Sequence, residues 1–133
     1  MNQPNGEVAR RVVESLIDSD RATWLEPFDP DVEYSPVKEW PESATRYGTD
    51  ALWDFMESVR AEWATWEMRV RDVRENGDRV LIEATVRGVG EKSGADLRGR
   101  LFHVYSFDAD GRIVKVQDFL ARSDAHAAAG LDP

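Results

Sequence analysis

The spacing of the apolar residues changes once along the chain, at Trp63, and this change constrains the fold more than any other feature. Upstream of it, apolar residues recur every three or four positions, which is typical of the buried face of a helix. The members of this stripe are Leu52, Phe55, Met56, Val59 and Trp63. Downstream of it, apolar and polar residues alternate, which is typical of half-buried strands. A long helix followed by a run of strands predicts an α+β fold.

Four extended segments follow the helix, and turn motifs separate them. Asn-Gly-Asp at 76–78 predicts a tight hairpin, and Asp-Ala-Asp-Gly at 108–111 predicts another turn. Residues 88–95 form a glycine-rich connection between these hairpins. We therefore expect four long antiparallel strands and a short one at 32–36. In this expectation the sheet curls around the helix from Asp50 to Trp63 into a cone-shaped α+β barrel.

Shorter helices are predicted on both sides of this unit. An apolar stripe runs from Val8 to Ile17, which indicates a first helix. Asp20 is expected to cap a short second helix over residues 21–26, and Thr49 to cap the long helix. Ser123 is expected to cap a terminal helix that Gly130 closes.

Length and composition limit the possible classes of protein. At 133 residues the chain is expected to form one domain, residues 1–133. The absence of cysteine excludes disulfides and thiol nucleophiles. A net charge of −9 argues against nucleic acid as a partner, because binding its backbone needs clustered cations. No apolar run approaches the roughly 20 residues that span a bilayer, so we expect no membrane partner and a cytoplasmic location.

Strand alternation predicts that His103 and Asp118 point into the space between sheet and helix. Arginines at the positions between the apolar residues of the third strand mark its opposite face as the outer one. A regular hairpin pairs Phe107 with Arg112 and leaves Asp118 one diagonal step from His103. A bulge in the turn would instead place the two residues directly opposite each other.

An inward histidine beside a carboxylate has two interpretations. Imidazole has an ordinary pKa of about 6.5, which suits proton transfer near neutral pH. The alternative is a structural pair, because buried polar groups must be paired in any case. The other histidine, His126, is expected to be exposed. Two distant histidines without cysteine give little support for a metal site, so neither a metal nor a cofactor is expected.

A small apolar ligand is expected in the cavity, because the inward faces carry aromatic and aliphatic side chains. The residues expected to line it are Tyr34, Trp40, Trp66, Met68, Ile82, Tyr105 and Val116. Trp53 and Trp63 are expected to belong to the ordinary core, and Glu33 to face solvent.

The outer face of the sheet carries a mixture of apolar and polar residues. Phe102, Val104 and Phe119 alternate there with charged and polar neighbours. Such a mixed strip on an exposed sheet suits an interface better than open solvent, so a homodimer is expected.

Five short motifs, in order along the chain, resemble those of a known superfamily. They are Phe28–Val32, Arg46–Gly48, His103–Phe107, Asp110–Val114 and Ala127–Leu131. With these motifs the chain resembles the nuclear transport factor 2-like superfamily, in its SnoaL-like branch. This resemblance implies the cone-shaped fold and a dimer. The superfamily includes polyketide cyclases, ketosteroid isomerase, dehydratases, epoxide hydrolases and noncatalytic binding proteins, so the resemblance leaves the activity open.

The resemblance can be carried over residue by residue. The three functional positions of ketosteroid isomerase correspond here to Ser35, His103 and Val12, none of which keeps the isomerase residue. SnoaL-type cyclases use an aspartate on the last strand and a histidine on the preceding one, a pattern that Asp118 and His103 match. The resemblance therefore implies a cofactor-free cyclase, isomerase or dehydratase acting on an apolar carbonyl compound. Asp118 would be the base and His103 the donor; the alternative is a noncatalytic ligand-binding or dimerising module.

Overall fold

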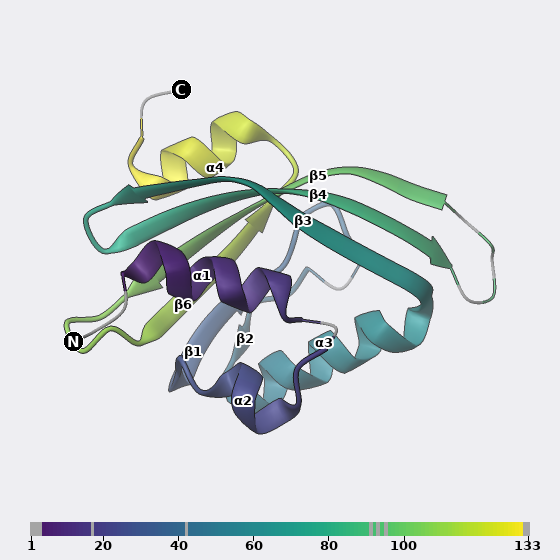
Figure 1. The fold of residues 1–133 in the computed structure, drawn as a ribbon, viewed down its shortest axis with the longest axis horizontal. Coiled ribbons are helices and arrows are strands. Elements are labelled where there is room, and N and C mark those ends of the chain that lie inside the picture. The colour runs from purple at the N-terminus through teal and green to yellow at the C-terminus, as the bar shows by residue number, and fades with distance from the viewer. Residues whose placement is uncertain are drawn as a thin grey trace.

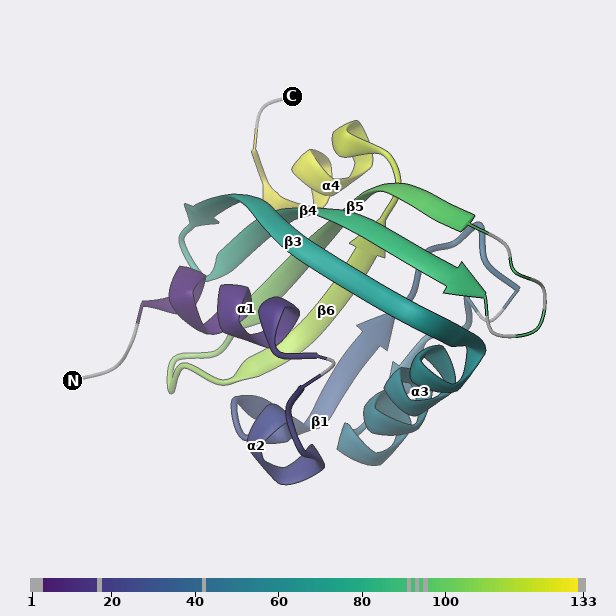
Figure 2. The ribbon, with the colours of Figure 1, turned by 45° about the vertical axis from the view of Figure 1, so that its right-hand side comes forward.

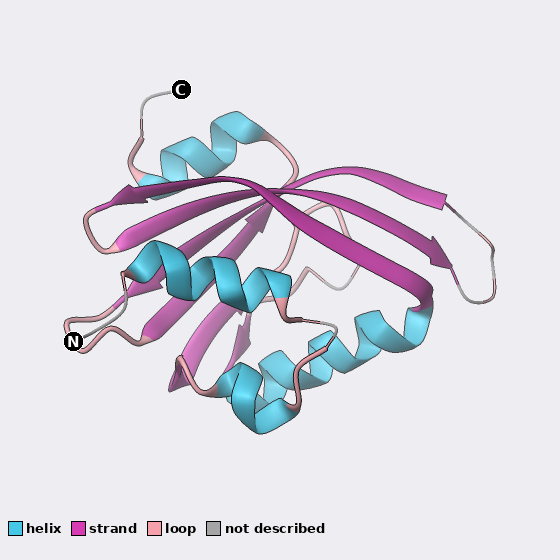
Figure 3. Cartoon of the chain, in the orientation of Figure 1, coloured by secondary structure: helices cyan, strands magenta, loops and turns pink. Residues whose placement is uncertain are grey.

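The computed structural model describes residues 4–16, 18–41, 43–90, 92, 94 and 96–131. Ile17 and Ala95, which belonged to predicted features, lie outside these residues. The chain alternates helices and strands in its first half and then forms a meander of strands (Figures 1 and 3). The elements are α1 (Asn5–Glu14), α2 (Arg21–Leu25), β1 (Phe28–Ser35), β2 (Arg46–Tyr47), α3 (Thr49–Glu62), β3 (Trp63–Asn76), β4 (Arg79–Gly90), β5 (Asp96–Phe107), β6 (Ile113–Phe119) and α4 (Arg122–Ala129).

The strands form one six-stranded sheet in the order β2-β1-β6-β5-β4-β3. Its four C-terminal strands pair antiparallel with their neighbours in sequence, as the alternation predicted. The α+β class is confirmed, but the expectation of a purely antiparallel sheet is wrong. β1 is eight residues long and pairs parallel with β6. The two strands are joined through α3 and the whole meander, and such a long connection permits parallel pairing.

Helices cover both faces of the curved sheet (Figures 1 and 2). α1, α2 and α3 lie on its concave side, whereas α4 lies on the opposite side. The concave side holds the main core, where Val32, Leu52 and Ile82 are fully buried. The candidate site lies in this layer, between the sheet and the N-terminal helices.

The helix ends follow the sequence signals only in part. Asp20 caps α2 as predicted, because its side chain accepts a hydrogen bond from the Thr23 N–H at 3.0 Å. Gly130 closes α4 with φ of 71°, a left-handed conformation that favours glycine. The predicted caps Thr49 and Ser123 are wrong: both residues lie inside the first turn of their helices, and neither cap position holds a side-chain hydrogen bond.

The glycine-rich connection is shorter than predicted. β4 continues to Gly90 and β5 begins at Asp96, so pairing extends into the region expected to be a loop. Gly88 is part of β4, where it pairs with Trp66 of β3 and Leu97 of β5.

α4 overturns two expectations about the outer face. Phe102 and Val104 are 4% and 0% exposed, because Ala125 and Ala129 of α4 pack over them. The apolar strip on which the dimer expectation rested is therefore covered within one chain. His126 is also buried, at 7% exposed, because it lies on the same helix.

Candidate active site

A bulge at the β5–β6 turn sets the geometry of the site. Phe107 pairs with Ile113, and the register shifts by one residue between Ser106 and Phe107. As a result His103 lies directly opposite Asp118. Of the two arrangements that the sequence allowed, the structure has the one with a bulge.

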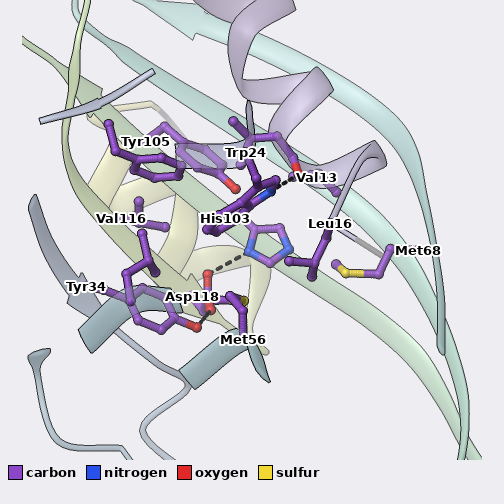
Figure 4. Close-up of a pocket in the computed structure, with 13 residues that line it drawn as sticks. Val13, Leu16, Trp24, Tyr34, Met56, Met68, His103, Tyr105, Val116 and Asp118 are labelled. Atoms are coloured by element: carbon purple, nitrogen blue, oxygen red, sulfur yellow. Dashed lines mark hydrogen bonds and ion pairs between the residues drawn. The ribbon is translucent and has the colours of Figure 1, made fainter. Parts of the chain in front are cut away.

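Three polar side chains from three strands form a chain of hydrogen bonds (Figure 4). His103 Nδ1 lies 2.6 Å from Asp118 Oδ1, and the Tyr34 hydroxyl donates to Asp118 Oδ2 at 2.5 Å. The His103 and Asp118 side chains are only 9% and 8% exposed. An ionised carboxylate can only accept, so both of its oxygens are occupied by donors. Asp118 therefore holds the imidazole in one orientation.

The other ring nitrogen of His103 has no partner. Nε2 is buried and makes no hydrogen bond within the described residues. Figure 4 shows it on the side of the ring away from Asp118, toward Leu16 and Met68. A neutral imidazole that donates from Nδ1 carries its lone pair on Nε2. In that tautomer Nε2 is the atom of the dyad that remains available, whereas both oxygens of the carboxylate are already engaged.

Two buried phenols surround this dyad. Burial raises the pKa of Tyr34 well above its ordinary value, and the charge of Asp118 raises it further. The pKa of Tyr105 is raised for the same two reasons, burial being the larger. Both phenols therefore stay protonated across the physiological range. The Tyr105 ring lies 6.3 Å from that of His103, and its hydroxyl makes no hydrogen bond within the described part of the chain.

The pocket that these groups share is small and apolar. Its volume is 40 Å³, enough for a water molecule or two but not for an organic ligand. Aliphatic and aromatic side chains from α1, from the segment after it, and from α2 and α3 close it opposite the sheet. The residues that close it on this side are Val12, Val13, Leu16, Trp24, Leu52 and Met56.

The predicted lining residues do not all lie together. Tyr34, Met68, Tyr105 and Val116 line the pocket of His103 and Asp118, together with Phe28. Trp40 and Trp66 line a second, larger cavity instead. Ile82 lines neither cavity and is fully buried in the core. The expectation that Trp66 and Ile82 share the pocket of His103 is therefore wrong, because alternation fixes a face but not a position along it.

Sequence reasoning missed the hydrogen bond of Tyr34 and the residues that close the pocket. It treated Tyr34 as an aromatic wall, because it did not foresee that β1 would pair with β6. In that pairing Tyr34 lies beside Val116, two residues before Asp118. Leu16 and Met56 were assigned only to helix stripes; no sequence signal distinguished them from ordinary core residues.

The SnoaL-like domain family matches residues 9–116, which is most of the chain. The chain belongs to this family. The SnoaL-like assignment confirms the resemblance that the five motifs carried. No curated protein matches the sequence.

Solved structures with the same architecture include several NTF2-like proteins. An NTF2-like protein from Burkholderia thailandensis has a TM-score of 0.81 at 19% identity, covering 98% of this chain and 100% of its own. TerC, co-crystallized with polyporic acid, has a TM-score of 0.76 at 21% identity, with 96% and 99% coverage. A protein of ketosteroid isomerase-like fold from Catenulispora acidiphila, in complex with trimethylamine, has a TM-score of 0.74 at 17% identity, with 95% and 94% coverage. These similarities establish the fold of this SnoaL-like domain.

The residues that the structure describes hold neither a cluster of metal ligands nor a membrane-spanning helix. These residues contain no group of three or more histidine, aspartate or glutamate side chains that could hold a metal ion. None of their helices is long and apolar enough to cross a bilayer.

Proposed function

We propose that this SnoaL-like protein is a cofactor-free acid–base enzyme that acts on a small, apolar carbonyl compound. The observation that carries the proposal is the unpartnered Nε2 of His103, buried in a pocket while Nδ1 is bound to Asp118. A polar atom left without a partner in the interior destabilises the fold, so such atoms are rare unless they have a function. The reaction classes that fit are isomerisation, dehydration and cyclisation.

The proposed mechanism assigns one role to each polar group. His103 Nε2 removes a proton from the carbon beside the carbonyl, and the C–H electron pair moves to form an enolate. The Tyr105 hydroxyl donates a hydrogen bond to the enolate oxygen, where the negative charge develops. The imidazolium then returns its proton to another carbon or to a leaving hydroxyl. In a cyclisation the enolate carbon instead attacks a second carbonyl, and the imidazolium gives its proton to the alkoxide that forms there.

Asp118 and Tyr34 are positioning residues in this mechanism. Asp118 faces His103 Nδ1, so it stabilises the imidazolium that forms during proton transfer. Tyr34 fixes the carboxylate from the other side. This differs from the expectation that Asp118 itself is the base, because both of its oxygens are already engaged.

The ligand enters only if the pocket widens. Leu16, Met56 and Met68 are partly buried and line the pocket; Leu16 and Met68 lie on the side that Nε2 faces, and Met56 lies beside Asp118 (Figure 4). Methionine side chains have several accessible rotamers at low cost, so Met56 and Met68 can move aside. The similar structures with bound polyporic acid and trimethylamine support small molecules as ligands of this fold.

A noncatalytic role is the alternative, and one observation favours it. The His103–Asp118 bond is closed and the pocket is only 40 Å³, as a satisfied structural pair would require. The two readings differ in what His103 Nε2 does, so the test is aimed at that atom.

The test measures proton abstraction without knowledge of the natural substrate. Small ketones with acidic α-protons, 2-indanone and acetylacetone, are incubated with the protein in D2O, and loss of the α-proton signal is followed by NMR. We expect the wild-type protein to accelerate the exchange. His103→Gln should slow it by at least 100-fold, which is the usual contribution of a general base.

Two further variants separate the roles. Asp118→Asn keeps the size of the side chain and should slow exchange while the fold is retained. Asp110→Asn, in the exposed 108–111 turn, is the matched control and should exchange like wild type. If wild type exchanges no faster than buffer, and Asp118→Asn changes only the melting temperature, the dyad is structural.

A further inference from the structure

A second cavity lies between the C-terminal part of α3 and the starts of β3 and β5. Its volume is 330 Å³, compared with 40 Å³ at the histidine. Three of the five tryptophans of the chain line it: Trp40, Trp63 and Trp66. Phe55, Glu62 and Leu97 also line it.

A glycine makes this cavity possible. Gly88 lies in β4 between Trp66 and Leu97, its partners on the neighbouring strands. A Cβ at this position would lie 2.9 Å from Cε3 of Trp66 and 3.0 Å from Cε3 of Trp63. Both indole rings therefore approach the backbone of β4 as only glycine allows. The two rings, 5.5 Å apart between centroids, are held beside the cavity by this contact.

The cavity contains a polar group that lacks a partner. Trp66 Nε1 is buried and makes no hydrogen bond within the described residues. An indole N–H can only donate, so an occupant that satisfies it must bring an acceptor. For comparison, Trp24 Nε1, at the histidine pocket, donates to the Val12 carbonyl at 3.0 Å. Trp66, which carries the unsatisfied donor, is one of the residues that line the second cavity.

The described lining of the cavity carries a single charged side chain. Glu62 is the only ionised side chain among the described residues that line the cavity, and it is exposed to solvent. The carboxylate and the aromatic faces would attract a cation, whereas the N–H of Trp66 needs an acceptor, so this donor is what distinguishes the two kinds of occupant. The lining therefore combines flat aromatic surfaces with the neutral, unpartnered N–H of Trp66. That combination suits a planar molecule that bears an oxygen acceptor.

The two cavities are separated by a pair of rings. Tyr34, whose hydroxyl binds Asp118, contacts Phe55 edge-on with ring centroids 5.2 Å apart. Arg46 lies 4.6 Å from the centroid of the Phe55 ring. Tyr34 lines the small pocket and Phe55 lines the large one. A molecule in the large cavity can therefore bind without reaching His103.

We infer that the tryptophan-lined cavity is a second binding site, for a planar, uncharged aromatic molecule with a carbonyl oxygen that accepts a hydrogen bond from Trp66 Nε1. The inference is independent of the acid–base role of His103. 1,4-Naphthoquinone is a suitable probe because it is flat and carries only acceptors, and the chain has no cysteine that a quinone could alkylate. Naphthalene is the matched probe without an acceptor.

The experiment follows the indole N–H signals by 15N NMR, with the Trp66 signal assigned by its loss in Trp66→Phe. Naphthoquinone should shift the Trp66 signal and leave that of Trp24 unchanged. Trp66→Phe keeps an aromatic ring and removes the donor, so it should weaken naphthoquinone binding about threefold to tenfold, the contribution of one neutral hydrogen bond. Naphthalene binding should change by less than about twofold.

Two glycines on neighbouring strands, Gly88 and Gly99, provide a matched pair of variants. Gly88→Ala places a methyl group against both indoles and should weaken both probes. Gly99→Ala, on the neighbouring strand, places its methyl group where nothing lies within 4 Å, and should weaken neither. His103→Gln should leave naphthoquinone binding unchanged even if it abolishes proton exchange, which separates this inference from the proposed function.

Three results would overturn the inference. One is no shift of the Trp66 signal at millimolar naphthoquinone. Another is a shift of the Trp24 signal instead, which would place the probe at the histidine pocket. The third is tighter binding of tetramethylammonium than of naphthoquinone, which would make the site a cation cage.

Discussion

Replacing Tyr34 by phenylalanine tests the hydrogen-bonded dyad directly. The change removes one hydroxyl, which donates to Asp118 Oδ2 at 2.5 Å, and keeps the ring that contacts Phe55. Tyr34 is 2% exposed and the Asp118 side chain 8% exposed, so water cannot easily replace the lost donor. The carboxylate oxygen is then left without its partner.

The magnitude follows from that geometry. A hydrogen bond to a charged group contributes about 1.5–3 kcal/mol to the free energy of unfolding. Because the carboxylate oxygen stays buried in the variant, water does not compensate for the lost bond, and the full contribution is lost. We therefore expect Tyr34→Phe to lower the free energy of unfolding by about 2 kcal/mol at pH 7. Urea denaturation followed by circular dichroism measures this difference, and the slope with urea concentration should be unchanged.

The control is the exposed tyrosine of β2. Tyr47 is 68% exposed, so Tyr47→Phe should change stability by less than about 0.5 kcal/mol. A Tyr34→Phe protein as stable as Tyr47→Phe would refute the argument, because it would mean that the hydroxyl contributes nothing to the dyad. The exchange assay gives a second readout: a positioning role predicts a slower rate, with less effect than His103→Gln.

Three other predictions rest on the structure, and a fourth rests on the family resemblance. Because burial raises the pKa of Tyr34 and Tyr105 in the folded protein, each phenol stays protonated there after the unfolded chain has lost its proton. Stability should therefore fall as pH rises above about 10, by up to about 1.4 kcal/mol per pH unit for each phenol, and Tyr105→Phe should reduce this slope in urea titrations at pH 9–12. Ile82→Ala should cost about 3–4 kcal/mol in the same measurement and leave naphthoquinone binding unchanged, since the residue belongs to the core. Gly130→Ala should cost about 1–2 kcal/mol, because its φ is 71° and a Cβ would lie 3.0 Å from Asn76 Nδ2; an unchanged melting curve would contradict this. The homodimer stays a prediction from the family resemblance, and sedimentation that gives only the 15.1 kDa species at micromolar concentration would contradict it.

The sequence predicted which face of the sheet a side chain lies on better than it predicted the position of that side chain along the face. Alternation along β5 and β6 correctly directs His103 and Asp118 to the concave side, because side chains on a strand point alternately to its two faces. Whether they face each other depends on one bulged residue near Phe107, which the composition of the turn does not determine. Placing Trp66 and Ile82 in that pocket failed for a related reason. Residues that share a face can be several rows apart along it.

Tertiary docking accounts for the other failures. Whether Phe102 is exposed depends on where α4 packs, and periodicity within β5 contains no information about that helix. The partner of Tyr34 depends on the parallel pairing of β1 with β6, which joins distant segments. The cap predictions failed where a residue without a polar side chain holds the cap position: Gly48, directly before Thr49, and Ala121, two residues before Ser123.

The parallel pairing of β1 with β6 also determines when the site can form. Tyr34 and Asp118 are 84 positions apart in the sequence, so a loop of that length must close before their hydrogen bond can form. Closing long loops slows folding, because the entropy is lost before the contact is gained. During synthesis, β1 emerges early and can pair only with β2 until residues 113–119 have left the ribosome. We therefore expect a nascent chain that ends before residue 113 to contain the β3–β4 hairpin but no assembled dyad.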